Sequence, residues 1–460
     1  MKKTFLAITF AMICALSVMA QQPKYVFYFI GDGMGFNQIN CTELYLASLN
    51  GKIGIEHLAF ADLPYATFAN SFSASSDVTD SAAAGTALAT ANKTKNSMLG
   101  VSADTVAVQS IAAWAKASGK KVGICTTVNI DDATPGAFYT HQANRGAHNA
   151  IGRELAASGY EYFAGSDFRK PKGDDGTDLH QICADNGYTY AYGYEEGKAK
   201  WKNADKLIMV QRKDRKRDIP YAIDREEGDL TLPQIVEIGL NTLMKNNKNG
   251  FFFMVEGGAI DHACHGRDAA TVIKETIDFD NAIKLALDFY EKHPKETLIV
   301  VTADHETGGM VPGNGHYYLN MERLQYQTCS TDAVTEKLTI LKKNRMRKTW
   351  EDVKNVLSES YGLFTEVPVS WRDEIALFEA YQNAFNGDAK EENWYSVNSA
   401  LASKARDLLN KSAGVSWASG SHSGGHVPVF AIGVGAEQFH GRLDNTQIPM
   451  VINKIAKYKK

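Results

Sequence analysis

The chain has 460 residues, of which 44% are hydrophobic, with 49 lysine and arginine residues against 53 aspartate and glutamate residues. This length exceeds one minimal domain and predicts either one large domain with insertions or two domains. The formal net charge of -4 carries no basic excess, so composition gives no signal for nucleic-acid binding.

The N-terminus has the pattern of a secretory signal peptide. Two lysines precede an apolar run at 5–18, and small residues before Gln21 resemble a cleavage site. The run is shorter than the roughly 20 residues that a membrane-spanning helix needs, which disfavours a retained anchor. We therefore expect a signal peptide at 1–20 and a mature chain at 21–460 that has no membrane span and is periplasmic or secreted.

The remaining cysteines do not form a recognisable framework. Five are left after the expected cleavage, scattered along the chain and without any CxxC pair: Cys41, Cys125, Cys183, Cys264 and Cys329. This pattern argues against a thiolate zinc site and against a disulfide scaffold, and leaves at most one disulfide of undetermined pairing open.

Apolar strand patterns alternate with helix patterns along most of the chain. Strands are expected at 24–30, 121–128, 160–164, 207–210, 251–255, 296–303 and 427–434, and helices at 106–118, 147–158, 232–245, 268–292 and from Thr446 onward. This alternation predicts a three-layer α/β/α sandwich with a mostly parallel central sheet.

The alternation stops between Gly313 and Trp417, where the sequence is charged and helix-rich. We expect a helical cap insertion at about 313–416 within the domain at 21–460. Its basic cluster from Lys342 to Lys348 favours a solvated helix face over a binding patch.

Acidic residues follow several of the expected strands directly. Asp32 follows the first strand, Glu256 follows FFFMV, and Asp304 and His305 follow LIVVTA. Any single one of them would ordinarily be a cap or turn residue. Because the carboxyl ends of parallel strands share one sheet edge, where ligands bind in open α/β sheets, the repetition predicts a metal or ligand site there.

The stretch FFFMVEGGAIDHACH adds two further candidate ligands. If the chain turns helical near Asp261, then Asp261 and His265 lie four residues apart on one helix face and can grip one ion. The alternative is a solvated helix start with Asp261 as its N-cap.

A fourth segment, SDVTDSAAAG, predicts a helix start with Ser81 near its N-terminus. Free backbone N–H groups and the helix dipole favour an anion such as phosphate at that position. A serine hydroxyl is a poor nucleophile unless a base or a metal lowers its pKa. Standing alone, Asp80 or Ser81 would simply be an N-cap.

Two more segments offer complementary chemistry. Asp132 and Thr134 supply hard oxygen atoms suited to magnesium, and Arg145 is a fork-shaped donor that can clamp two phosphate oxygens. Near the end, His422 and His426 lie in a Gly/Ser-rich loop before the last strand, and spacing alone does not choose between them.

These motifs resemble the bacterial alkaline phosphatases in order and spacing. The resemblance runs from about Lys24 to Ala456 apart from the insertion, and its motifs are D-S-A-A at 80–83, A-T-P at 133–135, E-G-G-x-x-D-x-x-x-H at 256–265, T-A-D-H-E-T-G-G at 302–309 and H-x-G-x-x-V-P at 422–428. It implies hydrolysis of small-molecule phosphate monoesters at alkaline pH by a homodimer, through a phosphoserine intermediate.

The resemblance also implies a role for each candidate residue. Ser81 would be the nucleophile and Arg145 the phosphate clamp. Each chain would bind two Zn²⁺ and one Mg²⁺. One zinc would be held by Asp261, His265 and His422, the other by Asp32, Asp304 and His305, and the magnesium by Asp32, Thr134 and Glu256. It favours His422 over His426, and makes Asp132 a residue that orients magnesium-bound water.

One position departs from the best-known enterobacterial pattern. His262 stands where a lysine is expected, whereas the animal branch pairs this histidine with another at the position of Asp132. Because histidine changes charge or binds zinc while lysine stays cationic, the mixed pair leaves the third metal and the pH optimum open.

Two other functions compete with the phosphomonoesterase. A phosphodiesterase or sulfatase of the same superfamily is disfavoured because Arg145 occupies the side of a second ester group, and because no CxPxR motif is present. A non-catalytic phosphate- or metal-binding protein would require a missing nucleophile or ligand, and none is missing.

Overall fold

The computed structural model describes residues 22–215, 219–315, 317–343, 348–387 and 389–459, so the expected signal peptide at 1–20 lies outside the described residues. Within these ranges the chain forms a ten-stranded sheet in the order β14-β2-β13-β8-β1-β7-β3-β4-β6-β5. The strands are β1 (Tyr25–Gly31), β2 (Tyr65–Asn70), β3 (Lys121–Asn129), β4 (Tyr162–Ser166), β5 (Tyr188–Tyr192), β6 (Lys206–Val210), β7 (Phe251–Gly257), β8 (Thr297–Ala303), β13 (Val427–Gly433) and β14 (Arg442–Asp444).

Among the described strands of this sheet, β13 alone runs antiparallel to its neighbours, β2 and β8. Alternate side chains of the central strands point to opposite faces, as a pleated strand requires. Phe253 contacts Tyr162 and Phe27 on one face, whereas Phe252 contacts Phe138 and Tyr28 on the other. Both faces are therefore apolar and need a covering layer.

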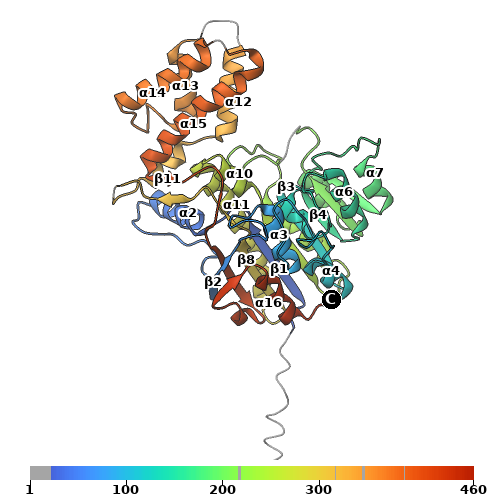
Figure 1. Ribbon diagram of the computed structural model, residues 1–460. Helices are drawn as coiled ribbons and strands as arrows, with labels where there is room; N and C mark the ends of the chain where they lie inside the picture. The colour runs from blue at the N-terminus through green and yellow to red at the C-terminus, as the bar shows by residue number, and fades with distance from the viewer. Residues whose placement is uncertain (1–21, 216–218, 316, 344–347, 388, 460) are drawn as a thin grey trace, which may run out of the picture.

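Helices supply both covering layers, which confirms the expected α/β/α sandwich with a mostly parallel sheet (Figure 1). Helix α11 (Ala269–Lys292) packs against β1 and β7, where its Phe289 contacts Phe27 and Phe251 respectively. The helices of the main body are α2 (Phe36–Leu49), α3 (Ser81–Thr90), α4 (Ile111–Ala117), α5 (Ala133–Gly136), α6 (His148–Ala157), α7 (Leu179–Asp185), α8 (Gly193–Lys200), α9 (Leu232–Met244), α10 (Ala259–His265), α11 (Ala269–Lys292) and α16 (Gln447–Ala456).

The central strands end together at one edge of the sheet. Gly31 of β1 pairs with Gly257 of β7 on one side and with Ala303 of β8 on the other. This register sets the residues that follow these strands next to each other. Two short ladders lie beyond the edge: β9 (Glu306–Thr307) with β12 (His422–Ser423), and β10 (Met310–Pro312) with β11 (Val415–Trp417).

The segment between β10 and β11 is helical and stands apart from the main body in Figure 1, coloured orange. It contains α12 (Thr331–Lys343), α13 (Trp350–Tyr361), α14 (Trp371–Tyr381) and α15 (Trp394–Ala413). Asp268, the N-cap of α11, joins it to the body. The Asp268 carboxylate accepts hydrogen bonds from the backbone N–H and hydroxyl of Thr331 and from the amide of Gln327.

Several details differ from the sequence expectations. The helix expected at 106–118 begins at Ile111, because Ser110 caps it by accepting from the N–H of Ala113. Strands β2, β5 and β14 and helix α2 were not expected. The basic cluster at 342–348 falls partly outside the described residues. The five cysteines from Cys41 to Cys329 are all free and buried.

Candidate metal and phosphate site

Three acidic side chains lie at the carboxyl ends of β1, β7 and β8: Asp32 and Asp304 directly follow β1 and β8, whereas β7 extends to Gly257 and so includes Glu256, which was expected to follow it. Asp32, Glu256 and Asp304 are all buried, and each has one carboxylate oxygen without a hydrogen-bond partner: Asp32 Oδ1, Glu256 Oε2 and Asp304 Oδ2. A buried charge without a partner is costly. Such oxygens fit a site that a cation completes.

His305 lies at the centre of this group and is fully buried. Its Nε2 atom is 3.4 Å from Asp32 Oδ1, 3.3 Å from Asp304 Oδ2 and 3.2 Å from the Ser81 hydroxyl. Ser81 is the first residue of α3, whose N-cap Asp80 accepts from the N–H of Ala83. Asp80 is therefore the cap, which leaves the Ser81 hydroxyl to point at the ligand cluster.

A second group forms beside the first. Asp261 lies in the first turn of α10, and its Oδ2 is 3.2 Å from His265 Nε2, as the expected i,i+4 pair requires. His422 Nε2 is 3.6 Å from Asp261 Oδ1 and 3.2 Å from His265 Nε2. His426 instead packs against Phe68, so the structure brings His422 and not His426 to this group.

The two imidazoles are held with their Nε2 atoms facing each other. His265 Nδ1 donates to the carbonyl of Gly420 at 2.8 Å, and His422 Nδ1 donates to the carbonyl of Thr79 at 2.9 Å. When each imidazole is neutral its proton is on Nδ1, and both Nε2 atoms then present lone pairs to the same space. A hydrogen bond from Nδ1 to a backbone carbonyl is typical of metal-binding histidines.

The sets that could hold a cation overlap at His305. The compact groups in the described part of the chain are Asp261 with His305 and His422, and Asp32 with Asp304 and His305. In each group the ligand atoms lie within 4.8 Å of one another. His265 is not a member of these compact groups, but its Nε2 lies 3.2 Å from Asp261 Oδ2 and 3.2 Å from His422 Nε2 in the first group. Mixed nitrogen and carboxylate donors of this kind suit zinc.

A third, all-oxygen set adjoins Asp32. Thr134, in the short helix α5, donates to Asp32 Oδ2 at 3.4 Å. Burial raises the pKa of the nearby Glu256 carboxyl to about 8, an effect that bonds from Thr126 and Thr134 oppose. Carboxylates with a hydroxyl are suitable ligands for magnesium.

The pKa shifts in the site follow from burial and from neighbouring charges. Burial raises the pKa of Asp304 to about 7 and lowers that of His305 to about 4. Burial and the charge of Asp304 raise the pKa of Asp32 well above its usual range. In the metal-free protein the bond with Asp261 raises the pKa of His265 to about 9.

Arg145 forms ion pairs with two carboxylates, one of which, Asp80, directly precedes Ser81. Its Nη1 lies 3.3 Å from Asp80 Oδ2 and its Nη2 lies 3.2 Å from Asp132 Oδ1. Burial alone would raise the pKa of Asp132, but Arg145 and the N–H of Ala133 hold it below its usual value. The guanidinium is thus fixed at two points and remains partly exposed.

Sequence reasoning missed residues that support this framework. Arg169 binds the second oxygen of Asp132 at 3.2 Å, and no motif indicates it. Glu306 accepts from Gln38, from the N–H of Gly309 and from the hydroxyl of Ser423, next to His422. Thr307 contacts two of the candidate ligands. Glu306 and Thr307 stand inside the quoted D-H-E-T-G-G motif, so that motif was a signal that could have found them.

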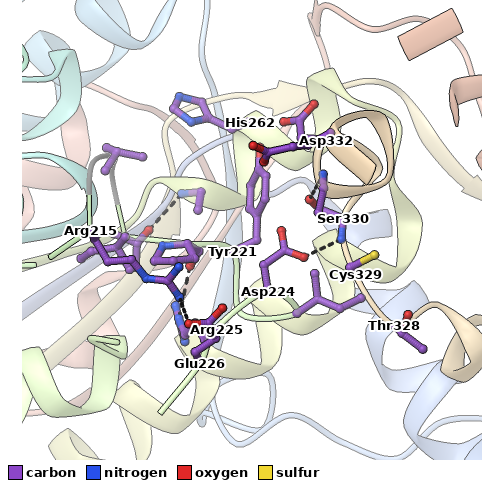
Figure 2. A pocket seen from close by; sticks show the side chains of 18 of the residues that line it. Arg215, Tyr221, Asp224, Arg225, Glu226, His262, Thr328, Cys329, Ser330 and Asp332 are labelled. Carbon is purple, nitrogen blue, oxygen red and sulfur yellow. Dashed lines mark hydrogen bonds and ion pairs between the residues drawn. The ribbon is translucent and has the colours of Figure 1, made fainter. Parts of the chain in front are cut away.

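His262 lies outside the ligand groups. It is exposed on α10 and lines a cavity of about 970 Å³ between the segments at 214–215 and 219–226, α10 and the start of α12. Figure 2 shows His262 on the same cavity as Tyr221, Asp224 and Asp332. A positive charge on His262 would help to lower the pKa of Asp132, after the larger effects of Arg145 and the N–H of Ala133.

Comparisons with known proteins place the chain in one family. The family model described as alkaline phosphatase matches residues 23–162 and 164–458. Alkaline phosphatase 3 of Bacillus subtilis is 30% identical over 454 residues, covering 95% of this chain and 89% of that protein. The tissue-nonspecific alkaline phosphatase isozyme of Gallus gallus is 31% identical over 342 residues, covering 63% of this chain and 65% of that protein.

Solved structures give the same result. The cold-active alkaline phosphatase of a Shewanella species has a TM-score of 0.80 and 27% identity, with 95% of this chain and 100% of that chain covered. The enzyme of the Antarctic bacterium TAB5 has a TM-score of 0.68 and 26% identity, with 95% and 100% covered. A variant of that enzyme has magnesium bound in a site designated M3.

Proposed function

Because the chain belongs to the alkaline phosphatase family, and is therefore a metal-binding enzyme that hydrolyses phosphate monoesters, we propose that it does so through a phosphoserine formed on Ser81. One observation carries this proposal. The Ser81 hydroxyl lies at the N-terminus of α3, 3.2 Å from His305 Nε2, where both carboxylate–histidine groups meet.

We assign the metals from the donor types and the unpartnered oxygens. One Zn²⁺ would be held by Asp261, His422 and the adjacent His265, a second by Asp32, Asp304 and His305, and one Mg²⁺ by Asp32, Thr134 and Glu256. When bound, ions at such sites lower the pKa of the serine hydroxyl and stabilise the negative oxygens of an in-line displacement.

Arg145 binds the substrate phosphate and orients it. Its fork-shaped guanidinium is held by Asp80 and Asp132, so little side-chain entropy is lost when it grips two non-bridging oxygens. The N-terminal amides of α3 add favourable dipoles for the same anion. Charge that spreads over those oxygens in a loose transition state is stabilised by these fixed donors.

The reaction then consists of two displacements at phosphorus. Ser81 Oγ, having lost its proton, bonds to phosphorus while the bond to the alcohol oxygen breaks, and the alcohol leaves after taking up a proton. Water next attacks phosphorus from the vacated side, the bond to Ser81 Oγ breaks, and inorganic phosphate is released. Ser81 is regenerated, and no oxidant or further reactant is consumed.

Replacement of Ser81 tests the mechanism directly. We expect Ser81→Ala to abolish hydrolysis of a simple aryl phosphate, and acid quenching to trap labelled phosphate on the wild type but not on the variant. Ser76→Ala, an exposed serine of the same segment, is the matched control and should remain fully active. Full activity of Ser81→Ala, or equal labelling of both proteins, would contradict the proposal.

The pH optimum, the ester preference, export and the oligomeric state each need a separate measurement. We propose an alkaline pH optimum, to be read from the rate profile, and faster turnover of monoesters than of diesters. We also propose export to the periplasm or medium with cleavage before Gln21, which N-terminal sequencing of the mature protein would verify. We further propose a homodimer, which sedimentation would detect. In the described residues no helix is long and apolar enough to cross a membrane.

A further inference from the structure

Thr307 lies at the junction of the chain segments that carry the candidate ligands. It is fully buried in β9, where its backbone pairs with His422 of β12. Its N–H donates to the carbonyl of Gly33, one residue from Asp32, and its carbonyl accepts from the amide of Gln38. Both backbone polar groups of Thr307 therefore have hydrogen-bond partners. The side chain is enclosed by protein and does not face solvent.

The Thr307 hydroxyl contacts one residue of each proposed zinc set. Its Oγ1 lies 2.5 Å from Asp261 Oδ1 and 3.2 Å from His305 Nδ1. A hydroxyl has a single proton to donate. Because Asp261 is a carboxylate that can only accept, the hydroxyl donates to Asp261 and must accept from an N–H at His305 Nδ1.

These two hydrogen bonds fix which nitrogen of His305 carries the proton and how the carboxylate of Asp261 is rotated. With the proton on Nδ1, His305 keeps the lone pair of Nε2, the atom that faces Asp32, Asp304 and Ser81. The bond to Asp261 Oδ1 fixes the rotation of that carboxylate and leaves Oδ2 toward His265. One hydroxyl therefore orients a ligand in each set.

We propose that Thr307 is a positioning residue that couples the two zinc sites, so that filling one site orders the ligand of the other. The inference rests on the zinc assignment of the proposed function. Hydrogen-bonding partners of metal ligands typically contribute about 10- to 100-fold to metal affinity. We expect this hydroxyl to contribute to both sites and to make zinc uptake cooperative.

Three variants separate the hydroxyl from the shape of the side chain. Thr307→Val keeps the branched shape without the hydroxyl, and Thr307→Ser keeps the hydroxyl without the methyl group. Thr276→Val is the matched control, because Thr276 is a fully buried threonine of α11 whose hydroxyl bonds only the carbonyl of Val272. Circular dichroism and melting of the metal-free proteins establish that each variant is folded.

The readout is zinc binding by the full-length, metal-stripped protein in competition with a chromogenic chelator. We expect two ions to bind cooperatively to the wild type, to Thr307→Ser and to Thr276→Val. Thr307→Val should bind them independently, with affinity about 10- to 100-fold lower. Wild-type titration of Thr307→Val, or equal defects in Thr307→Val and Thr307→Ser, would overturn the coupling role. A wild type that binds no zinc would instead overturn the metal assignment.

Discussion

Arg145 is held in place by two carboxylates, Asp132 and Asp80, of which Asp80 directly precedes Ser81. Because it contributes charge and a fixed fork, we expect Arg145→Ala to lower kcat/KM by about 100- to 1,000-fold, in the range of losing an oriented transition-state donor. Arg145→Lys keeps the charge without the fork and should lie between the wild type and Arg145→Ala. Steady-state kinetics, with the inhibition constant of inorganic phosphate, measure both effects.

A matched arginine distinguishes a local effect from a general loss of charge. Arg153 lies on α6 and pairs with exposed Asp175, away from the ligand groups. Arg153→Ala should leave kcat/KM and phosphate inhibition unchanged. Phosphate inhibition that is equally strong in Arg145→Lys and the wild type would show that the bidentate grip is unimportant.

Glu275 gives a pH dependence outside the metal site. It is buried on α11, where its carboxylate accepts from the N–H of Ala222, and burial raises its pKa from the ordinary 4.5 to about 7. Between these values the folded protein holds a proton that the unfolded chain has lost. The free energy of unfolding therefore falls as pH rises from about 4.5 to about 7, by up to a few kcal/mol.

Glu275→Gln removes this titration and keeps an acceptor for Ala222. We expect the variant to gain stability relative to the wild type as pH rises from about 5 to about 8. Urea unfolding of both proteins at a series of pH values, with the same metal content, gives the difference directly, because other titrating groups cancel. Parallel stability curves would refute the shifted pKa of Glu275.

Much of the residue-scale geometry follows from a simple sequence argument. Asp32 and Asp304 directly follow apolar strands and Glu256 is the last residue but one of β7, so parallel pairing alone brings them to one edge. Thr307 does not follow from the strand ends; the motif that contains it marks its position but not the two ligands that its hydroxyl contacts. Its role depends on β12 returning from more than a hundred residues away to pair with β9.

At the scale of elements, burial decided which strands the sequence could predict. The central strands β1, β7 and β8 are buried along their entire length, so continuous apolar runs mark them. In contrast β2 is largely exposed along its first three residues, and its sequence YATFAN gives only a weak signal. The helix expected from Val106 begins at Ile111, because a capping hydroxyl outweighed the apolar pattern before it.

Asp268 connects two elements and offers an element-scale prediction. It caps α11 by accepting from the N–H of Thr271 and also binds the backbone N–H of Thr331 at the start of α12. Asp268→Ala removes a helix cap and leaves buried donors without a partner. We expect a loss of about 2–4 kcal/mol in the free energy of unfolding.

An exposed cap provides the comparison. Asp352 completes the capping box of α13 on the surface, so Asp352→Ala should cost about 1 kcal/mol or less. Denaturant unfolding of both variants measures the two costs. Equal costs would mean that the link between α11 and α12 adds nothing to an ordinary helix cap, and that the helical segment at 313–416 is held to the body by other contacts.

At the scale of the whole molecule, the fold concentrates buried negative charge at one edge of its sheet. Asp32 lies there close enough to Asp304, Asp261 and Glu256 for each of these carboxylates to raise its pKa. Like charges that are buried together destabilise a folded protein unless a cation offsets them. The folded chain is therefore expected to be most stable when its metals are bound.

Metal removal tests this dependence on the intact enzyme. A ligand present at 100 times its dissociation constant stabilises the folded state by about 2.7 kcal/mol. We expect chelation to lower the melting temperature by several degrees and to abolish activity, and zinc with magnesium to restore both. Glu256→Gln should have the opposite balance. Its metal-free form should melt above the metal-free wild type, because the variant no longer buries a carboxyl whose pKa is raised to about 8, and it should gain less on adding magnesium. Scanning calorimetry of both proteins with and without metals makes the comparison. A Glu256→Gln variant that magnesium stabilises as strongly as the wild type would remove Glu256 from the magnesium site, and the unpartnered oxygen at the end of β7 would then be a cost of the fold that no metal offsets.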